Sequence, residues 1–209
     1  MTGRLVGGVL FLPVPLVLWL FTRPPLGVSP SIVLGVVVMA THRWYARPFA
    51  LRRAGGRCLW CGKEIAEGPG LRIDEPFGTT TWRACGDAHA GAVARVLGWA
   101  DGRATFLRVG ILGTLGFFLV GVTVADVGWL SPIGTDDAIA FFRLGIAVTV
   151  LPLGWLSTRA SAPPAGPCRS PFPLHVPSLI GLWAVLWLFR LIGLVWFVLA
   201  MSHAVRRLT

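Results

Sequence analysis

The chain has 209 residues, of which 55% are hydrophobic and 13% are charged. Soluble domains average about 45–50% apolar and about 25% charged residues, so this composition excludes a soluble globular protein. The formal net charge is +10, but no aromatic–basic motif of a nucleic-acid-binding module accompanies it. We therefore expect an integral membrane protein whose partner is the lipid bilayer and not a nucleic acid.

Five apolar segments follow one another along the chain: Leu5–Phe21, Leu26–Ala40, Phe106–Leu130, Ala138–Leu156 and Val176–Met201. A helix needs about 20 residues to cross the hydrocarbon core, and the last three segments are long enough. The first two are short, and Pro13 and Pro15 interrupt the first. They predict either a kinked hairpin of two spans or a re-entrant pair. A cleaved signal peptide is disfavoured, because no small-x-small cleavage site precedes the second apolar segment.

The distribution of charge predicts the orientation. Loops that stay in the cytoplasm are enriched in Lys and Arg. Eleven of the 19 basic residues lie in or beside the hydrophilic stretch between the second and third segments: Arg43, Arg47, Arg52, Arg53, Arg57, Lys63, Arg72, Arg83, Arg95, Arg103 and Arg108. We expect this stretch to face the cytoplasm, although five spans would then place Arg206 and Arg207 outside, against the rule. The Arg-, Ala- and Gly-rich, Lys-poor composition suggests a multi-pass protein of a bacterial inner (plasma) membrane.

Two features inside the spans indicate helix packing or function. Gly110, Gly113 and Gly116 recur every three residues in the third segment, which predicts close approach to a neighbouring helix. Arg190 lies near the centre of the last segment, where a charge costs about 2.5–3.5 kcal/mol on insertion scales. Two interpretations stay open for it: an intramembrane functional or subunit-interface residue, or a structural residue that bonds helix-terminal carbonyls.

Three of the four cysteines lie in the hydrophilic stretch together with a histidine. Cys58 and Cys61 form a C-x2-C pair, and after 23 intervening residues Cys85 and His89 form a C-x3-H pair. Gly62 permits a tight knuckle after the first pair. On a helix, residues four apart share one face, so the second pair can point at one ion. Three thiolates and one imidazole form a closed tetrahedral set, typical of structural Zn²⁺.

The residues around these ligands predict a small α+β insert. The stretch from Leu71 to Trp82 has β-forming residues around turn residues at 74–78, which predicts a hairpin. The stretch from Asp87 to Trp99 predicts a helix with an apolar stripe formed by Ala90, Val93, Val96 and Leu97. The acids of the insert are expected to be solvated surface: Glu64, Glu67, Asp74, Glu75 and Asp87.

Residues 58–99 resemble a treble-clef zinc finger of the TRASH/MYM type, in which a C-x2-C-G knuckle, a hairpin and a C-x3-C or C-x3-H pair follow in order. Cys58, Cys61, Cys85 and His89 match the four ligand positions of that family. The final His replaces the commoner Cys, and Trp82 lies three residues before Cys85 instead of one. The resemblance implies a local fold and a metal, but no activity, and the membrane part resembles no family.

Other interpretations of the cysteines stay open. They could be thiols without metal, or could bind iron or another metal, since softness and geometry do not single out zinc. A redox C-x-x-C pair is disfavoured because no thioredoxin-like βαβ pattern surrounds it, and a disulfide is disfavoured in the cytoplasm. Cys168 lies in an irregular Pro-rich connector. With His175 it could form half of a second metal site, but a bystander thiol is favoured because two ligands do not make a site.

Together these patterns predict an all-α polytopic membrane protein of about five transmembrane helices with a small treble-clef-like zinc-binding insert. We expect a membrane hairpin at 1–41, a cytoplasmic insert at 42–104 and a three-helix region at 105–209 with a connector at 157–175. The favoured function is a membrane-anchored accessory, assembly or scaffold protein that contacts a protein partner or larger membrane complex. A membrane metal sensor or metal-trafficking protein is the alternative. An enzyme is disfavoured, because no catalytic residues are recognisable.

Overall fold

The computed structural model describes residues 37, 40, 44, 47–76, 78–127, 134–161, 168–175 and 177–209. The predicted segment Leu5–Phe21 and nearly all of Leu26–Ala40 lie outside these residues. The chain divides into two compact units, which are described separately. The sheet unit comprises Met1–Gly98 and Ser161–Val185, and the helix unit comprises Trp99–Ala160 and Leu186–Thr209.

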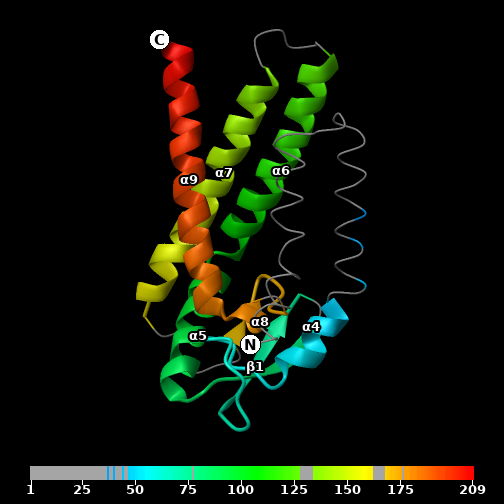
Figure 1. Cartoon of the computed structure of the whole chain (residues 1–209), viewed down its shortest axis with the longest axis vertical. Helices are drawn as coiled ribbons and strands as arrows, with labels where there is room; N and C mark the ends of the chain where they lie inside the picture. The colour runs from blue at the N-terminus through cyan, green and yellow to red at the C-terminus, as the bar shows by residue number, and fades with distance from the viewer. Residues whose placement is uncertain are drawn as a thin grey trace. The chain divides into compact units, whose positions relative to one another are not determined.

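The sheet unit contains a three-stranded sheet of order β2-β1-β3. Strands β1 (Gly70–Glu75) and β2 (Gly78–Arg83) pair antiparallel, with Glu75 opposite Gly78. Gly78 turns the chain with a φ of 119°, a conformation that side chains disfavour. This is the predicted hairpin, and it is confirmed; Figure 1 labels β1.

A third strand comes from the Pro-rich connector, which was expected to be irregular. Strand β3 (Cys168–Arg169) pairs parallel with β1, and Cys168 lies opposite Ile73. The N–H of Ser170 donates to the C=O of Asp74 at 2.9 Å. A strand of two residues is too short to produce a hydrophobic pattern, so the expectation of irregular structure was wrong at these two residues.

Helices complete the sheet unit: α4 (Arg47–Ala54), most of α5 (Asp87–Asp101), α8 (Pro177–Ile180) and the start of α9 (Leu182–Leu208). The helix predicted after Cys85 is confirmed as α5. Its stripe faces inward, because Val93, Val96 and Leu97 are buried and Ala90 is half-buried. The residues buried in this unit also include Leu59, Ile73, Trp82, Leu174 and Leu179.

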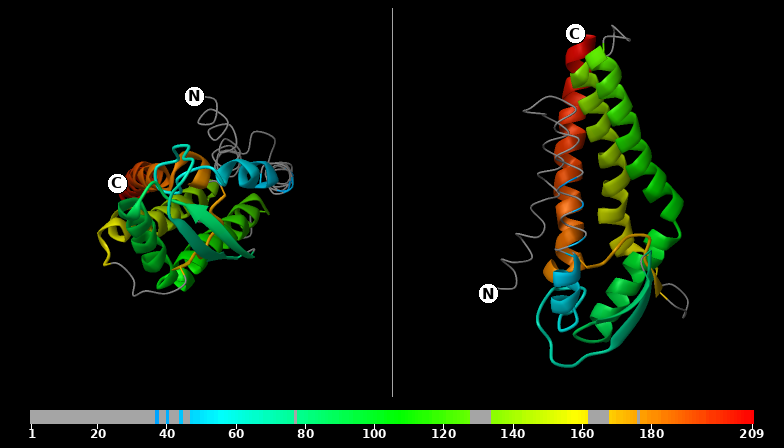
Figure 2. Two further views of the ribbon diagram at one scale, coloured as in Figure 1. Left: turned by 90° about the horizontal axis from the view of Figure 1, so that it is seen from below. Right: turned by 90° about the vertical axis from the view of Figure 1, so that its right-hand side faces the viewer.

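The helix unit contains α6 (Ala104–Val127), α7 (Thr135–Leu156), the 3₁₀ turn η2 (Ser157–Arg159) and the rest of α9. Within the described residues, three helices are long and apolar enough to cross a membrane: Ala104–Gly121, Thr135–Arg159 and Leu182–Leu208. These correspond to the last three predicted segments. The start of the third differs, because Gly181 with a φ of 96° separates α8 from α9. The three helices run side by side in both Figure 1 and Figure 2.

Helices α6 and α7 pack antiparallel through reciprocal glycine–threonine contacts. A Cβ built on Gly110 would lie 2.4 Å from Thr149 Oγ1, and one on Gly145 would lie 2.4 Å from Thr114 Oγ1. One helical turn further, the rings of Phe118 and Phe142 have centroids 4.8 Å apart. The contacts on α6 therefore recur every four residues.

Of the close approaches predicted for the three glycines of α6, the described part of the chain confirms the one at Gly110. Among the residues that the structure describes, a Cβ on Gly113 would meet only Val109 of its own helix, and one on Gly116 would meet nothing within 4 Å. A three-residue spacing drifts away from the contact line, whereas a ridge of residues four apart follows it. Among the described residues, the expectation is confirmed for Gly110 and finds no support at Gly113 and Gly116.

Helices α7 and α9 are also antiparallel neighbours. A Cβ on Gly193 would lie 2.7 Å from Leu151 Cγ, and one on Gly154 would lie 3.0 Å from Arg190 Cγ. Nearer the N-terminus of α7, Phe142 and Trp196 have ring centroids 5.7 Å apart. Helix α7 therefore contacts both α6 and α9.

Candidate metal centre

Cys58 and Cys61 are held by a tight backbone knuckle. The N–H of Cys58 donates to the C=O of Lys63 at 2.9 Å, and the N–H of Gly62 donates to the C=O of Cys58 at 2.8 Å. Gly62 has a φ of 70°, which a side chain would strain. The knuckle is fixed to the hairpin, because the N–H of Leu59 donates to the C=O of Arg83 at 2.8 Å.

Cys85 and His89 come from the end of the hairpin and the start of α5. Cys85 follows β2 by two residues, and His89 lies in the first turn of the helix. The backbone N–H of Cys85 donates to the Sγ of Cys58 at 3.3 Å. The hairpin therefore brings the second pair of residues back to the knuckle that holds the first pair.

The four side chains converge. Their ligand atoms all lie within 4.8 Å of one another, which makes the group able to hold a metal ion. The Sγ of Cys58 is 3.5 Å from His89 Nδ1, and the Sγ atoms of Cys61 and Cys85 are 3.5 Å apart. Around a tetrahedral ion with a Zn–S distance of about 2.3 Å, neighbouring ligand atoms are about 3.5–3.8 Å apart. The sequence pairs therefore meet at a spacing that suits one ion.

The thiols differ sharply in acidity. Burial raises the pKa of Cys58, but the backbone N–H groups of Cys61 and Cys85 and hydrogen bonds from the Cys85 thiol and His89 outweigh it and lower the pKa from 9.0 to about 6. Desolvation, together with the hydrogen bonds and negative charge of Cys58 and Cys61, raises the pKa of Cys85 to about 12. The first thiolate thus opposes the ionisation of the next, and a cation would remove that opposition.

The cluster is buried on one side only. Cys58 is fully buried and Cys85 is exposed, while Cys61 and His89 are half-buried. Because it is buried, the side chain of Cys58 is held in place by the surrounding fold. The exposure of Cys85 gives an ion or a small chelator access to the cluster from one side.

Two acids that were expected to be solvated surface join parts of the sheet unit. The Nε1 of Trp82 donates to Glu75 Oε1 at 2.8 Å, and the N–H of Leu174 donates to Glu75 Oε2 at 2.8 Å. Glu64 accepts from Arg57 Nη2 at 2.6 Å, although its own side chain is 78% exposed. The expectation was wrong for Glu75, which is half-buried. The sequence did not indicate this, because its partner Leu174 lies 99 positions away.

Arg190 lies nine residues into α9 and turns toward the end of α7. Its Nε donates to the C=O of Gly154 at 2.7 Å, and its Nη2 donates to Thr158 Oγ1 at 3.2 Å. The guanidinium also lies over the rings of Trp155 and Trp187, at 4.8 and 4.6 Å from their centroids. These contacts are those of the structural interpretation, and the proposed functional or interface role stays a prediction.

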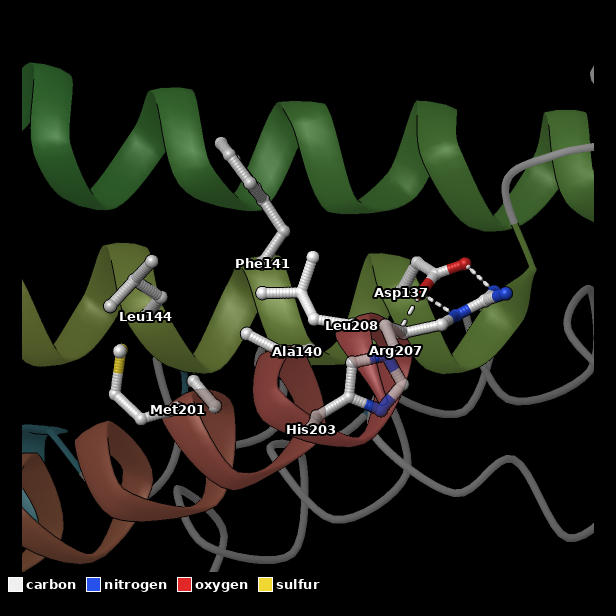
Figure 3. Close-up of a pocket in the computed structure, with 10 residues that line it drawn as sticks. Asp137, Ala140, Phe141, Leu144, Met201, His203, Arg207 and Leu208 are labelled. Atoms are coloured by element: carbon white, nitrogen blue, oxygen red, sulfur yellow. Dashed lines mark hydrogen bonds and ion pairs between the residues drawn. The ribbon is translucent and has the colours of Figure 1, made fainter.

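A second polar cluster joins the other end of α7 to the end of α9. Asp137 Oδ1 is 2.8 Å from His203 Nε2 and accepts from Arg207 Nε at 3.0 Å, and its Oδ2 accepts from the N–H of Gly134 at 2.9 Å. Figure 3 shows these side chains beside a cavity of about 410 Å³ that is otherwise lined by apolar residues such as Phe141 and Met201. Arg207 is therefore paired within the protein, and the orientation expected from the basic residues stays a prediction.

Comparison with known proteins returns no relative: no protein-family model matches the chain, and neither a curated protein nor a solved structure gives a significant match. The assignment of the metal centre therefore depends on its own residues.

The sequence did not indicate that Arg57 and Gly181 adjoin this centre. Arg57 is 5% exposed, and its Nη1 donates to the C=O of Leu179 at 3.0 Å. Gly181 contacts the knuckle backbone. A weak signal was present in both cases, because Arg57 directly precedes the first ligand and Gly181 interrupts an apolar run.

Proposed function

We propose that the chain is a membrane-anchored zinc protein in which a structural Zn²⁺, bound by Cys58, Cys61, Cys85 and His89, maintains a platform for protein–protein contact. The observation that carries the proposal is the convergence of the four ligand atoms within 4.8 Å. Four protein ligands leave no open coordination position, which is characteristic of structural and not catalytic zinc. Knuckle, hairpin and helix follow in the order of a treble-clef finger, which supports that assignment.

Metal content tests the zinc assignment. Full-length protein purified in detergent should contain one zinc per chain, measured by mass spectrometry, and Cys58→Ser and His89→Ala should each lose it. Cys168→Ser is the matched control, because Cys168 lies on β3 and is not a member of the cluster. Iron or copper in the wild type, or zinc retained in both ligand variants, would refute the proposal.

The edge of β2 supports contact with a protein partner. The C=O of Arg83 is bonded outward to Leu59, and outward groups alternate along an antiparallel pair. The backbone groups of Thr81 and Thr79 therefore also point away from β1, and both residues are exposed. Such an edge can accept an added strand from another chain.

A proline substitution tests this edge. Thr81→Pro removes an outward N–H while leaving the ladder to β1, whereas Thr80→Pro removes an N–H that bonds β1. We expect chemical crosslinking in native membranes to give a defined adduct with the wild type and none with Thr81→Pro at unchanged zinc content. Thr80→Pro should instead lower both the yield of the crosslinked adduct and the zinc content. Absence of an adduct in the wild type would count against the platform.

The exposure of Cys85 favours one alternative, a metal sensor or trafficking protein, because an accessible thiolate lets the ion leave by ligand exchange. Exchange of bound zinc with an enriched isotope separates the two functions. Exchange over hours or longer supports the structural platform, and exchange within minutes supports sensing or trafficking.

A further inference from the structure

The first turn of α9 is bonded directly to the knuckle that carries Cys58 and Cys61. The N–H of Leu182 donates to the C=O of Leu59 at 2.8 Å, and the N–H of Trp183 donates to the C=O of Trp60 at 3.0 Å. The first N–H groups of a helix have no partner within the helix itself. Two of those of α9 are satisfied by the two residues between the ligands.

Two glycines bring these backbones into contact. A Cβ on Gly62 would lie 2.6 Å from the carbonyl carbon of Ile180, and a Cβ on Gly181 would lie 2.7 Å from that of Cys61. Both glycines have positive φ, 70° and 96°. No side chain fits between the segments, so the hydrogen bonds of Leu182 and Trp183 require glycine at both positions.

Arg57 adds a side-chain bond to the same contact. It directly precedes Cys58, and its buried Nη1 donates to the C=O of Leu179 in α8 at 3.0 Å. The N–H of Gly181 in turn donates to the C=O of Pro177 at 2.7 Å. Arg57, which precedes the first ligand pair, is therefore bonded to the segment from Pro177 to Trp183, and Gly62, which follows the pair, packs against the same segment.

We propose that metal occupancy fixes the start of α9. The carbonyls of Leu59 and Trp60 keep their direction when Cys58 and Cys61 hold a single ion, and they then complete the first turn of this membrane-length helix. Without the ion the knuckle keeps fewer constraints, and the N–H groups of Leu182 and Trp183 lose their partners. This inference rests on the proposed zinc site, and it assigns that site the role of a metal-dependent clamp on α9.

Hydrogen exchange measured by mass spectrometry on full-length protein in detergent tests the clamp. The zinc-loaded and chelator-stripped forms are compared after their metal content has been determined. We expect amides in residues 178–185 to exchange about tenfold faster or more in the stripped form, because their hydrogen bonds open, while residues 190–205 stay unchanged. Faster exchange at 58–63 alone would overturn the clamp and leave the zinc site intact. Absence of zinc in the untreated protein would instead refute the site itself.

Gly181→Ala tests the same link without altering a ligand. Gly55→Ala is the matched control, because a Cβ on Gly55 would meet no atom of the described part of the chain within 4 Å. We expect Gly181→Ala to bind zinc about tenfold more weakly and to show fast exchange at 178–185 even when loaded, and Gly55→Ala to behave as the wild type. Wild-type affinity and protection in Gly181→Ala would overturn the proposal. If Gly181→Ala does not fold, the comparison of the two wild-type forms still decides it.

Discussion

The Nε of Arg190 donates to the C=O of Gly154 at 2.7 Å, so a side chain from α9 closes the C-terminus of α7. The last four carbonyls of a helix have no partner within it. Here two further side chains also bond carbonyls at this end of α7. Ser157 Oγ donates to the C=O of Leu153, and Thr158 Oγ1 donates to the C=O of Trp155 at 3.1 Å. A positive charge at this end also interacts favourably with the helix dipole.

Arg190→Gln should therefore destabilise the protein. It removes a charged hydrogen bond and the contacts with two tryptophan rings, and we expect a loss of about 2–3 kcal/mol. Arg190→Lys should recover only part of this, because an ammonium lacks the planar fork that bonds and stacks together. The measurement is the unfolding temperature of the detergent-purified protein.

Arg206→Gln is the control for loss of a positive charge, because Arg206 is exposed in the last turn of α9. It should unfold at the wild-type temperature. If Arg190→Gln also unfolds at the wild-type temperature, the structural role fails and the interpretation as an interface or anion-binding residue gains support.

The contact between α6 and α7 predicts a position-dependent effect of glycine substitution. Gly110→Ala should cost about 1–3 kcal/mol, because its new methyl group would meet the buried Thr149. Gly116→Ala should be neutral or slightly stabilising, because the methyl group meets no described residue within 4 Å and alanine favours a helix. Thermal unfolding of the two variants in one detergent decides this. Equal losses in both would mean that Gly110 does not lie at a tight contact.

The cluster of the candidate metal centre was predictable from sequence, because the spacings that indicate it are local. Cys58 and Cys61 are three residues apart, Cys85 and His89 are four apart, and Asp87 to Trp99 has a clear helical period. The contacts that surround the centre were not predictable. The N–H of Leu174 reaches Glu75 across 99 positions, and Arg57 reaches Leu179 across 122. A single sequence carries no pattern for such pairs.

In the membrane-length helices, too, local features were predictable from sequence and contacts between distant residues were not. Length and hydropathy identified the last three membrane-length helices, because these are properties of continuous segments. The start of α9 was placed at Val176 instead of Leu182, since one glycine in an apolar run changes the hydropathy little. The spacing of glycines in α6 suggested three contact positions, but only the position of α7 shows that Gly110 alone is close to it.

The cluster around Asp137 predicts a loss of stability when its charge is removed. Asp137→Asn keeps an oxygen that can accept from the N–H of Gly134 but weakens the pairs with His203 and Arg207. The carboxylate is only 25% exposed, so we expect a loss of about 1–2 kcal/mol. Asp136→Asn, the exposed neighbour in the same helical turn, is the matched control. Chemical unfolding in mixed micelles measures both, and equal stability of the two variants would contradict the prediction.

Zinc affinity should depend steeply on pH, because a thiol must lose its proton before it can bind a metal. The pKa of Cys85 is raised to about 12, so this thiol is protonated in the metal-free protein throughout the neutral range and releases a proton on binding. The pKa of Cys58 is lowered to about 6, so its thiolate is already present above that pH. Below pH 6 Cys58 is protonated as well and must release a further proton on binding.

Zinc affinity therefore falls as pH falls, by about tenfold or more per pH unit near neutrality, and more steeply below about pH 6. Competition with a chromogenic chelator between pH 5 and 8 measures the slope, and calorimetry in two buffers of different ionisation enthalpy counts the protons. Cys168→Ser should reproduce the wild-type slope, since this residue lies outside the cluster. A zinc affinity that is constant over this range would mean that the thiols do not lose protons when the ion binds. The ligands of the candidate metal centre would then have to be reassigned.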